Sequence, residues 1–342
     1  MSKYKIIVLC VLFLAIPWVS NNYLLALINL CAIATIGAHG LNILTGYTGL
    51  ISLGHAAFIG VGAYTAAVFS TQFNVPWFLS ILIAGIVTAL IGLIFGLPSL
   101  RLRGMYLAMA TLAASVILIF IFEQWKSVTG GVSGFYISSP TVFGISLGDY
   151  KYFYYLSVGM AVLATIGVKL LFASRTGRAF IAIRDRDLAA EIVGINAFHY
   201  KLYSFAISSF YAGIAGALLG FYLTFATPES FTLAETIKYI AMIIIGGLGT
   251  LSGPIVGAVF VTLFPDVLSI IIAPIQHLMP DYGPSALRNI IFGGLIIFFL
   301  VYEPKGLVSL FQRMALFAKK FKEKKPATVA SQKKVSIENI NE

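Results

Sequence analysis

The chain has 342 residues, of which 59% are hydrophobic and only 11% are charged, and its mean hydropathy is +0.94. These values exclude a soluble globular protein, whose composition is far more polar. The net charge of +10 does not indicate nucleic-acid binding, because the basic residues gather in loops and in the tail. Membrane orientation and anionic lipid account for that placement, so we expect an integral membrane protein that contacts membrane lipid.

Ten apolar segments follow one another along the chain, and most approach the roughly 20 residues that cross a bilayer. They predict an all-α integral membrane protein, a polytopic helical bundle of about ten spans within residues 1–303, followed by a basic tail at 304–342. The predicted spans are 6–20, 23–45, 50–70, 77–98, 106–123, 152–172, 200–224, 237–249, 254–272 and 287–303.

The lysine and arginine residues alternate with these spans. Counted from the N-terminus, every second connection is basic, and together with the tail these connections hold 17 of the 23 Lys and Arg residues. Positive loops stay in the cytoplasm, so we expect both termini there, together with the loop at 173–199. Beyond residue 325 the tail is polar and lacks helical periodicity, and we expect it to be disordered.

The sequence lacks the residues that several kinds of function require. There is no Gly-Lys dipeptide and hence no phosphate-binding loop, so any ATP must be bound by another chain. Only His39 and His55 lie deep in the spans, and the acidic residues avoid the middle of the spans, with Glu235 toward an outer end. We therefore expect no catalytic residue, no metal site and no cofactor, and the passage of a solute as the function. A self-contained secondary transporter remains an alternative.

A glycine-rich segment at 45–67 predicts close helix packing. Small residues let helix backbones approach one another, and this glycine density also permits a broken or re-entrant helix where protein covers the backbone. The segment adds polar groups at Thr45, Thr48, Ser52 and His55. One interpretation is that they form interhelical hydrogen bonds, and His55 fits this as a packing residue. The other is that some of them line the solute path.

The glycine pattern occurs twice. Residues 46–52 read GYTGLIS, and residues 246–252 read GGLGTLS, which is compatible with two related halves. In transporters with internal repeats, sites lie where short or glycine-interrupted segments meet. The short span at 237–249 ends in such a segment, so we place the path beside it. The candidate path residues are Gly46, Thr48, Ser52, His55, Gly247 and Gly249.

The loop at 173–199 predicts an amphipathic helix over about 178–193, capped near Ser174 or Thr176 and ended by Gly194. Apolar residues recur on one face and charged residues on another. Two interpretations stay open from this pattern. The helix either lies on the inner membrane surface, with its charges solvated, or docks onto a cytosolic partner. The apolar face holds Ile181, Leu188, Ile192 and Ile195, and the charged face holds Arg184, Asp187 and Glu191.

Five stretches resemble the LivM–LivH family, the permease subunits of ABC importers for branched-chain amino acids. In chain order they are NILTGYTGLISLGHAAFIGVGAYTAA, RLRGMYLAMATLA, SVTGGVSG, GRAFIAIRDRDLAAEIVGIN and GGLGTLSGPIVGA. The long connection between spans five and six resembles the LivM type. The resemblance implies a bacterial plasma (inner) membrane protein, a second permease subunit of LivH type, two cytosolic ATPase subunits that use the ATP, and an extracytoplasmic substrate-binding protein. It also implies transport of leucine, isoleucine and valine, with urea or short amides as the alternative substrates.

The same resemblance implies that the loop at 173–199 holds the coupling helix, which sits in a groove of an ATPase. The importer signature there is Glu-Ala-Ala, three residues and Gly. This chain has Leu188 in place of the first Glu, with Asp187 beside it, so the signature is degenerate. The candidate coupling residues are Arg178, Arg184, Asp187, Ala189, Ala190, Glu191 and Gly194.

Overall fold

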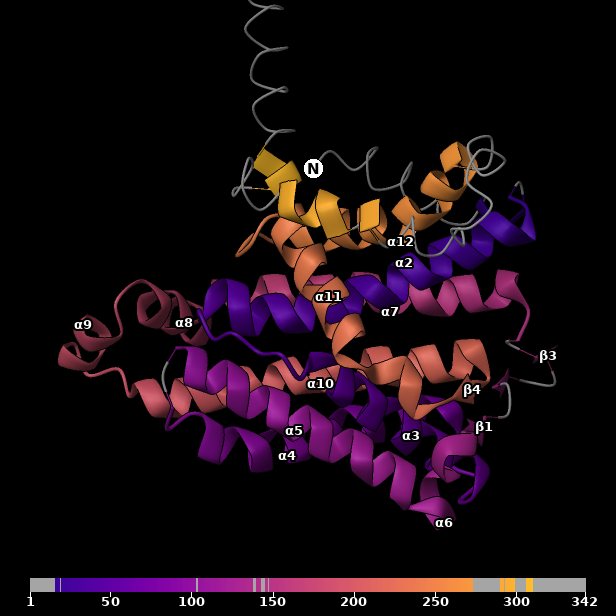
Figure 1. Cartoon of the computed structure of the whole chain (residues 1–342), viewed down its shortest axis with the longest axis horizontal. Coiled ribbons are helices and arrows are strands. Elements are labelled where there is room, and N and C mark those ends of the chain that lie inside the picture. Colours follow the sequence, from indigo (N-terminus) through magenta and orange to yellow (C-terminus); the bar gives the residue numbers. More distant parts are fainter. Residues whose placement is uncertain are drawn as a thin grey trace, which may run out of the picture.

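The structure is a computed structural model that describes residues 16–18, 20–102, 104–137, 140–142, 145–146, 148–272, 290–291, 293–298 and 306–309. The described chain is mostly helical, with long helices lying side by side (Figure 1). The predicted first span and the tail lie almost wholly outside the described residues, and the predicted last span is described only in part.

Six of the predicted spans are confirmed as helices long and apolar enough to cross a membrane. The first is a composite of α2 and the π-helix η1, which continues it without a break. The six are α2 with η1 (Asn22–Leu41 and Asn42–Tyr47), α4 (Trp77–Ser99), α5 (Met105–Gln124), α7 (Tyr150–Ala173), α10 (Ala197–Leu223) and α12 (Gly253–Ile272).

Two further helices are too short for a full span. Helix α3 (His55–Thr71) is shorter than the predicted span 50–70, whereas α11 (Leu233–Gly246) has 14 residues and is as short as the predicted span 237–249, but begins four residues earlier. The backbone from 48 to 54 is irregular, and protein covers its second half from Ser52, where Leu53 N donates to Thr111 Oγ1 of α5 at 3.0 Å. Irregular backbone at membrane depth requires such covering.

Helix α10 forms the centre of the bundle and packs against α2, α3 and α4. Glycines make this packing close, because a Cβ atom at Gly62 would overlap the backbone of Gly213, and one at Gly216 would overlap the carbonyl oxygen of Ile59. Close backbone approach is how helices associate where lipid removes the hydrophobic driving force. The predicted role of the glycine-rich segment in helix packing is therefore confirmed at α3.

The two ends of the bundle differ. At one end lie α6 (Lys126–Thr129) and two small antiparallel sheets, in which β1 (Phe135–Tyr136) pairs with β4 (Phe225–Ala226) and β2 (Thr141–Val142) with β3 (Ile145–Ser146). Two short 3₁₀ helices, η2 (Gly131–Ser133) and η3 (Pro228–Phe231), belong to the same connections. At the opposite end α8 (Arg175–Asp185) and α9 (Asp187–Ile192) project from the bundle (Figure 1). The predicted outer connection at 126–150 and the loop at 173–199 thus lie at opposite ends.

The loop at 173–199 forms two helices, so the prediction of one continuous helix over 178–193 is wrong. Helix α8 (Arg175–Asp185) ends where Arg186 takes an extended conformation, with φ −155° and ψ 101°, and α9 (Asp187–Ile192) follows. The break lets Asp187 form an ion pair with Lys201 at the start of α10. This pair turns α9 back toward the bundle, which a straight helix could not do.

Candidate functional site

The two glycine segments recognised in the sequence contact each other directly. The side chain of Asn42, which is fully buried, joins them with two hydrogen bonds. Its Oδ1 accepts from the backbone N of Gly249 at 3.0 Å, and its Nδ2 donates to the carbonyl oxygen of Thr250 at 3.0 Å. The amide of Asn42 therefore holds two backbone groups of the second segment, the N–H of Gly249 and the carbonyl of Thr250, at the start of η1. We call residues 46–49 and 246–250, with Asn42, the glycine junction.

The loop at 173–199 reaches this junction through one side chain. Arg184, on the last turn of α8, donates from Nη1 to the carbonyl oxygen of Gly46 at 3.0 Å. Its guanidinium also pairs with Asp185 at 3.0 Å. The face of α8 opposite to solvent is anchored by Phe180, which is fully buried beside Ile43 of η1 and Val168 of α7. Helix α8 is thus bound to the junction by both apolar packing and a charge-assisted hydrogen bond.

Glycine is required in the junction by space and by backbone conformation. A Cβ atom at Gly46 would overlap Asn42 Oδ1, and one at Gly249 would lie 2.8 Å from the carbonyl oxygen of Gly46. Gly49 and Gly249 also have φ values of +76° and +69°, in the left-handed region that residues with a side chain rarely adopt. Gly306, beyond the predicted last span, packs on Gly247 in the same manner. Gly49 and Gly249, which occupy the same position in the two segments, therefore share a left-handed backbone conformation.

The remaining candidate path residues are buried and hydrogen-bonded. Thr48 Oγ1 donates to the carbonyl oxygen of Ile43 at 3.0 Å, and His55 Nε2 donates to that of Gly37 at 2.9 Å. Ser52 is buried, and its Oγ accepts from Gly54 N at 3.4 Å. The cavities found among the described residues are lined by other side chains. In this conformation these residues therefore close the bundle.

The coupling candidates divide between the two helices of the loop. Arg178 donates to the carbonyl oxygen of Ala173 at 3.0 Å, and Arg184 donates to that of Gly46 in the junction. Both arginines therefore form hydrogen bonds within this chain. On α9, Asp187 is paired with Lys201, Ala190 is buried, and Ala189 and Glu191 are exposed. Gly194 follows α9 with φ +90°, in the left-handed region that favours glycine after a helix, so it ends the helix as the sequence predicts.

Helix α9 presents apolar side chains to its surroundings. Leu188, Ile192 and Val193 are 68%, 86% and 82% exposed. Three large aliphatic side chains side by side at the tip of a loop are costly in water and mark a surface that another molecule covers. This apolar tip is the part of the loop that is free to contact a partner.

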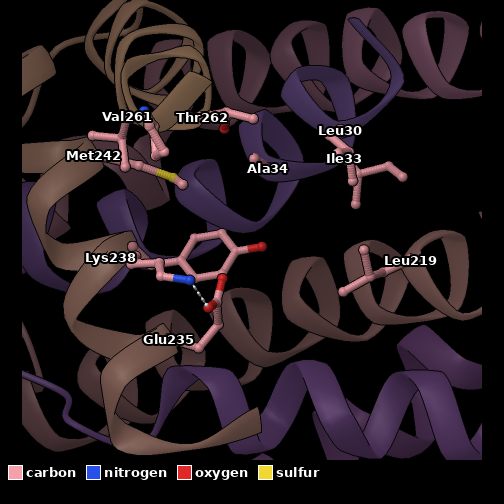
Figure 2. A pocket seen from close by; sticks show the side chains of 11 residues that line it. Leu30, Ile33, Ala34, Leu219, Glu235, Lys238, Met242, Val261 and Thr262 are labelled. Carbon is pink, nitrogen blue, oxygen red and sulfur yellow. Dashed lines mark hydrogen bonds and ion pairs between the residues drawn. The ribbon is translucent and has the colours of Figure 1, made fainter. Parts of the chain in front are cut away.

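A cavity of about 330 Å³ lies beside the short helix α11, where the path was expected, and it contains a charged pair that the sequence predicts only at the edge of a span. Glu235 and Lys238 face each other on α11, with Oε2 and Nζ 2.7 Å apart. Figure 2 shows this pair, with Ile33, Ala34 and Val261 across the cavity. The spacing of an acid and a lysine three residues apart on one helix was the signal that could have revealed it.

These features define a multi-pass membrane protein with a tightly packed helical core and a loop fixed to a glycine junction. Residues 23–300 match the family described as the permease component of branched-chain amino acid transport systems, and the chain belongs to this family. As a permease of the ABC type it is a transport protein and not itself an enzyme. Membership in the family implies that it works in a complex with the other components of an ABC transporter.

Comparison with curated proteins gives the same kind of permease. The chain is 29% identical over 333 residues to the high-affinity branched-chain amino acid permease LivM of Escherichia coli strain K12, covering 90% of this chain and 75% of the relative. It is 27% identical to a probable LivM permease of Methanocaldococcus jannaschii, over 67% of each chain. A shorter similarity, 30% over 37% of this chain and 36% of the relative, links it to the xylose permease XylH of Haemophilus influenzae. No solved structure matches the chain.

Proposed function

We propose that this chain is a transmembrane permease subunit that passes leucine, isoleucine and valine inward across a bacterial inner membrane, driven by ATP hydrolysis on separate subunits. It works beside a LivH-type permease, two cytosolic ATPases and an extracytoplasmic binding protein. Residues 1–303 form the permease domain with about ten spans and two related halves, and 304–342 form a basic tail. Both termini and the loop at 173–199 face the cytoplasm.

The observation that carries this proposal is the contact between Arg184 and Gly46. An importer powered from outside its own chain needs a cytoplasmic element that receives force and a connection from that element to the transport path. Helix α9 offers the receiving surface, through the exposed side chains of Leu188 and Ile192. Helix α8 provides the connection, because it binds the junction where the two glycine segments meet.

Under this proposal the glycine junction is the cytoplasmic closure of the path. Gly46, Thr48, Ser52, His55 and Gly247 are buried and Gly249 is partly buried because the path is closed, and all six line it when the helices separate. The similar backbone at Gly49 and Gly249 supports the relation between two halves. The coupling role extends to Arg178, Ala189, Ala190, Glu191 and Gly194 as residues that shape the docking loop.

The substrate assignment follows the family and the apolar character of the cavity beside α11. Urea and short amides are the second candidates, and a self-contained secondary transporter is the candidate of a different class. The test is to purify the tagged chain from its host, identify the chains that co-purify, and measure uptake by the reconstituted complex. We expect ATP-dependent leucine uptake that requires the binding protein. Uptake that persists without ATP while an ion gradient is held would refute the proposal.

A further inference from the structure

The cavity beside α11 combines features that the proposed function does not by itself require. Its walls come from three helices around the short α11, and they are mostly apolar, with polar groups at Tyr239, Thr262 and one charged pair. There Glu235 and Lys238 carry opposite charges on neighbouring turns of α11. The apolar side chains around the cavity are Leu30, Ile33 and Ala34 of α2, Leu219 of α10, Met242 of α11, and Val261 of α12.

The charged pair is partly exposed, and it lies on a helix of the bundle and not in a connecting loop. Thr236, next to Glu235 in the first turn of α11, accepts a hydrogen bond from the backbone N of Ala56 at 3.1 Å. The same end of α3 is tied to α2, because His55 donates to the carbonyl oxygen of Gly37, well inside the 26-residue composite span. Ionisable side chains inside a membrane domain are costly, and where they occur they usually mark a substrate or ion path.

The pair is reachable from the cavity. The side chains of Lys238 and Glu235 retain 50% and 32% of their exposure, so each has hydrogen-bonding positions left for a ligand. The next residue, Tyr239, is almost fully buried and packs with its ring against Gly37, which fixes this turn of α11 in place. Because α11 cannot rotate, the charged groups of Glu235 and Lys238 keep fixed positions on the cavity wall.

We propose that this cavity is a substrate subsite for a zwitterionic α-amino acid with an aliphatic side chain, and this rests on the proposed function. Lys238 binds the carboxylate of the amino acid and Glu235 binds its ammonium group. The aliphatic side chain lies against Ile33, Leu219 and Val261. A volume of about 330 Å³ lies at the lower end of the range of about 300–1,000 Å³ for small-molecule sites, as suits a single amino acid.

The chemistry of the pair separates this substrate class from the alternatives. Urea and short amides carry no charged group, so on entering they would displace water from Glu235 and Lys238 without supplying an opposite charge to either. A zwitterion supplies one partner for each charge and replaces the ion pair with two ion pairs. The subsite therefore accepts leucine and rejects both leucinamide, which lacks the carboxylate, and 4-methylpentanoate, which lacks the ammonium group.

The first test uses the reconstituted complex and its ATP-dependent leucine uptake. We expect Glu235→Gln and Lys238→Gln each to reduce uptake by about tenfold or more, since each removes a charge-assisted contact with the substrate. The matched controls Glu229→Gln and Lys151→Gln, which remove one acid and one lysine at the same end of the bundle, should transport as the wild type. Complex yield and melting temperature are measured for every variant.

A double variant distinguishes a substrate site from a structural ion pair. An ion pair as exposed as this one contributes little to the stability of a fold, so replacing both partners by apolar residues should cost little. If the pair only holds the fold, Glu235→Met/Lys238→Met should restore the uptake lost in the single variants. If it binds substrate, the double variant should keep its melting temperature and still fail to transport. Restored uptake in the double variant overturns the subsite.

The second test measures the ligand directly. Thr262 lies on the cavity wall, so in a complex with Cys10 and Cys31 of this chain replaced by Ala, Thr262→Cys reports on occupancy through its rate of alkylation. Leucine should slow the alkylation, whereas leucinamide and 4-methylpentanoate should not, and adding Lys238→Gln should remove the protection. Equal alkylation with and without leucine, in a wild-type complex that imports leucine, overturns the subsite alone. A wild-type complex that imports no leucine overturns the proposed function and the subsite with it.

Discussion

Arg184 and Gly46 are 138 positions apart in the chain, and the guanidinium of the first donates to the carbonyl oxygen of the second at 3.0 Å. The contact joins the loop between α7 and α10 to the end of the first described span. It also lies beside Gly249, whose added Cβ would be 2.9 Å from the same guanidinium. One arginine therefore contacts both glycine segments, and its removal is the most direct test of the coupling proposal.

We expect Arg184→Gln to uncouple ATP hydrolysis from transport. The variant loses a charge-assisted hydrogen bond worth about 1.5–3 kcal/mol, so uptake should fall by roughly tenfold or more while the ATPase subunits still co-purify. Uptake and the stimulation of ATP hydrolysis by loaded binding protein are measured on one preparation. Arg175→Gln, at the exposed start of the same helix, is the control and should leave both near wild type. Normal stimulation in Arg184→Gln would contradict the role assigned to this contact.

Gly249→Ala should damage the junction through its backbone. The added methyl group meets the carbonyl oxygen of Gly46 at 2.8 Å, and the φ of +69° is unfavourable for alanine. We expect a loss of about 1–3 kcal/mol of stability and a lower melting temperature of the purified complex. Gly159→Ala on α7 is the matched control, since a Cβ there has no neighbour within 4 Å and should change little. Equal melting temperatures for the two variants would mean that the junction is looser than the structure shows.

Gly194 allows a test in which conformation is separated from space. A Cβ atom at this position meets nothing within 4 Å, yet φ is +90°. Gly194→Val should therefore bend the end of α9 and reduce stimulated ATP hydrolysis, whereas Gly194→Asn, which tolerates the left-handed region better, should retain most of it. Complex assembly serves as the check on folding. A loss of equal size in both variants would indicate that the side chain, and not the backbone, is at fault.

The apolar tip of α9 should be the surface on which the ATPase docks. Ile192 is 86% exposed, so Ile192→Ser removes apolar contact area without disturbing the fold of this chain. We expect less ATPase to co-purify with the variant, measured as the ratio of the two chains after affinity purification. Val132→Ser, at the opposite end of the bundle and 65% exposed, is the control. If the ATPase ratio is unchanged in Ile192→Ser, the tip contacts the membrane surface instead.

The predicted orientation can be tested by labelling single cysteines with a reagent that does not cross membranes. In a chain with Cys10 and Cys31 replaced by Ala, Ser133→Cys should react from outside intact cells. Val193→Cys should react only after the cells are opened. Both positions are exposed in the structure and lie at opposite ends of the bundle. The reverse labelling pattern would show that the basic loops face outward.

The sequence predicted the long helices well because their signal is strong and local. The apolar runs that become α4, α5 and α7 are long enough that hydropathy alone locates them. The sequence predicted the start of α3 and the end of α8 poorly. The start of α3 depends on a hydrogen bond from Leu53 to Thr111, and the end of α8 depends on the ion pair between Asp187 and Lys201. Contacts between distant residues set these boundaries, and periodicity contains no information about them.

For the candidate site, the repeated glycines were visible in the sequence but the partners that join them were not. Asn42 appears in the sequence as one polar residue in an apolar span, and nothing near it indicates that its side chain reaches residues 249 and 250. Glu235 and Lys238 were visible as a pair three residues apart, yet their position on a cavity wall became clear only from the packing of α11 against α2 and α12.

The glycines at 46 and 249 have a mechanical consequence. Most contacts between helices pass through side chains, whose rotamers can shift and absorb a small displacement of one helix. Here the backbone of one segment touches the backbone of the other, and the amide of Asn42 and the guanidinium of Arg184 beside them are already held by hydrogen bonds. A displacement of α8 is therefore transmitted almost completely to the main chain at Gly46.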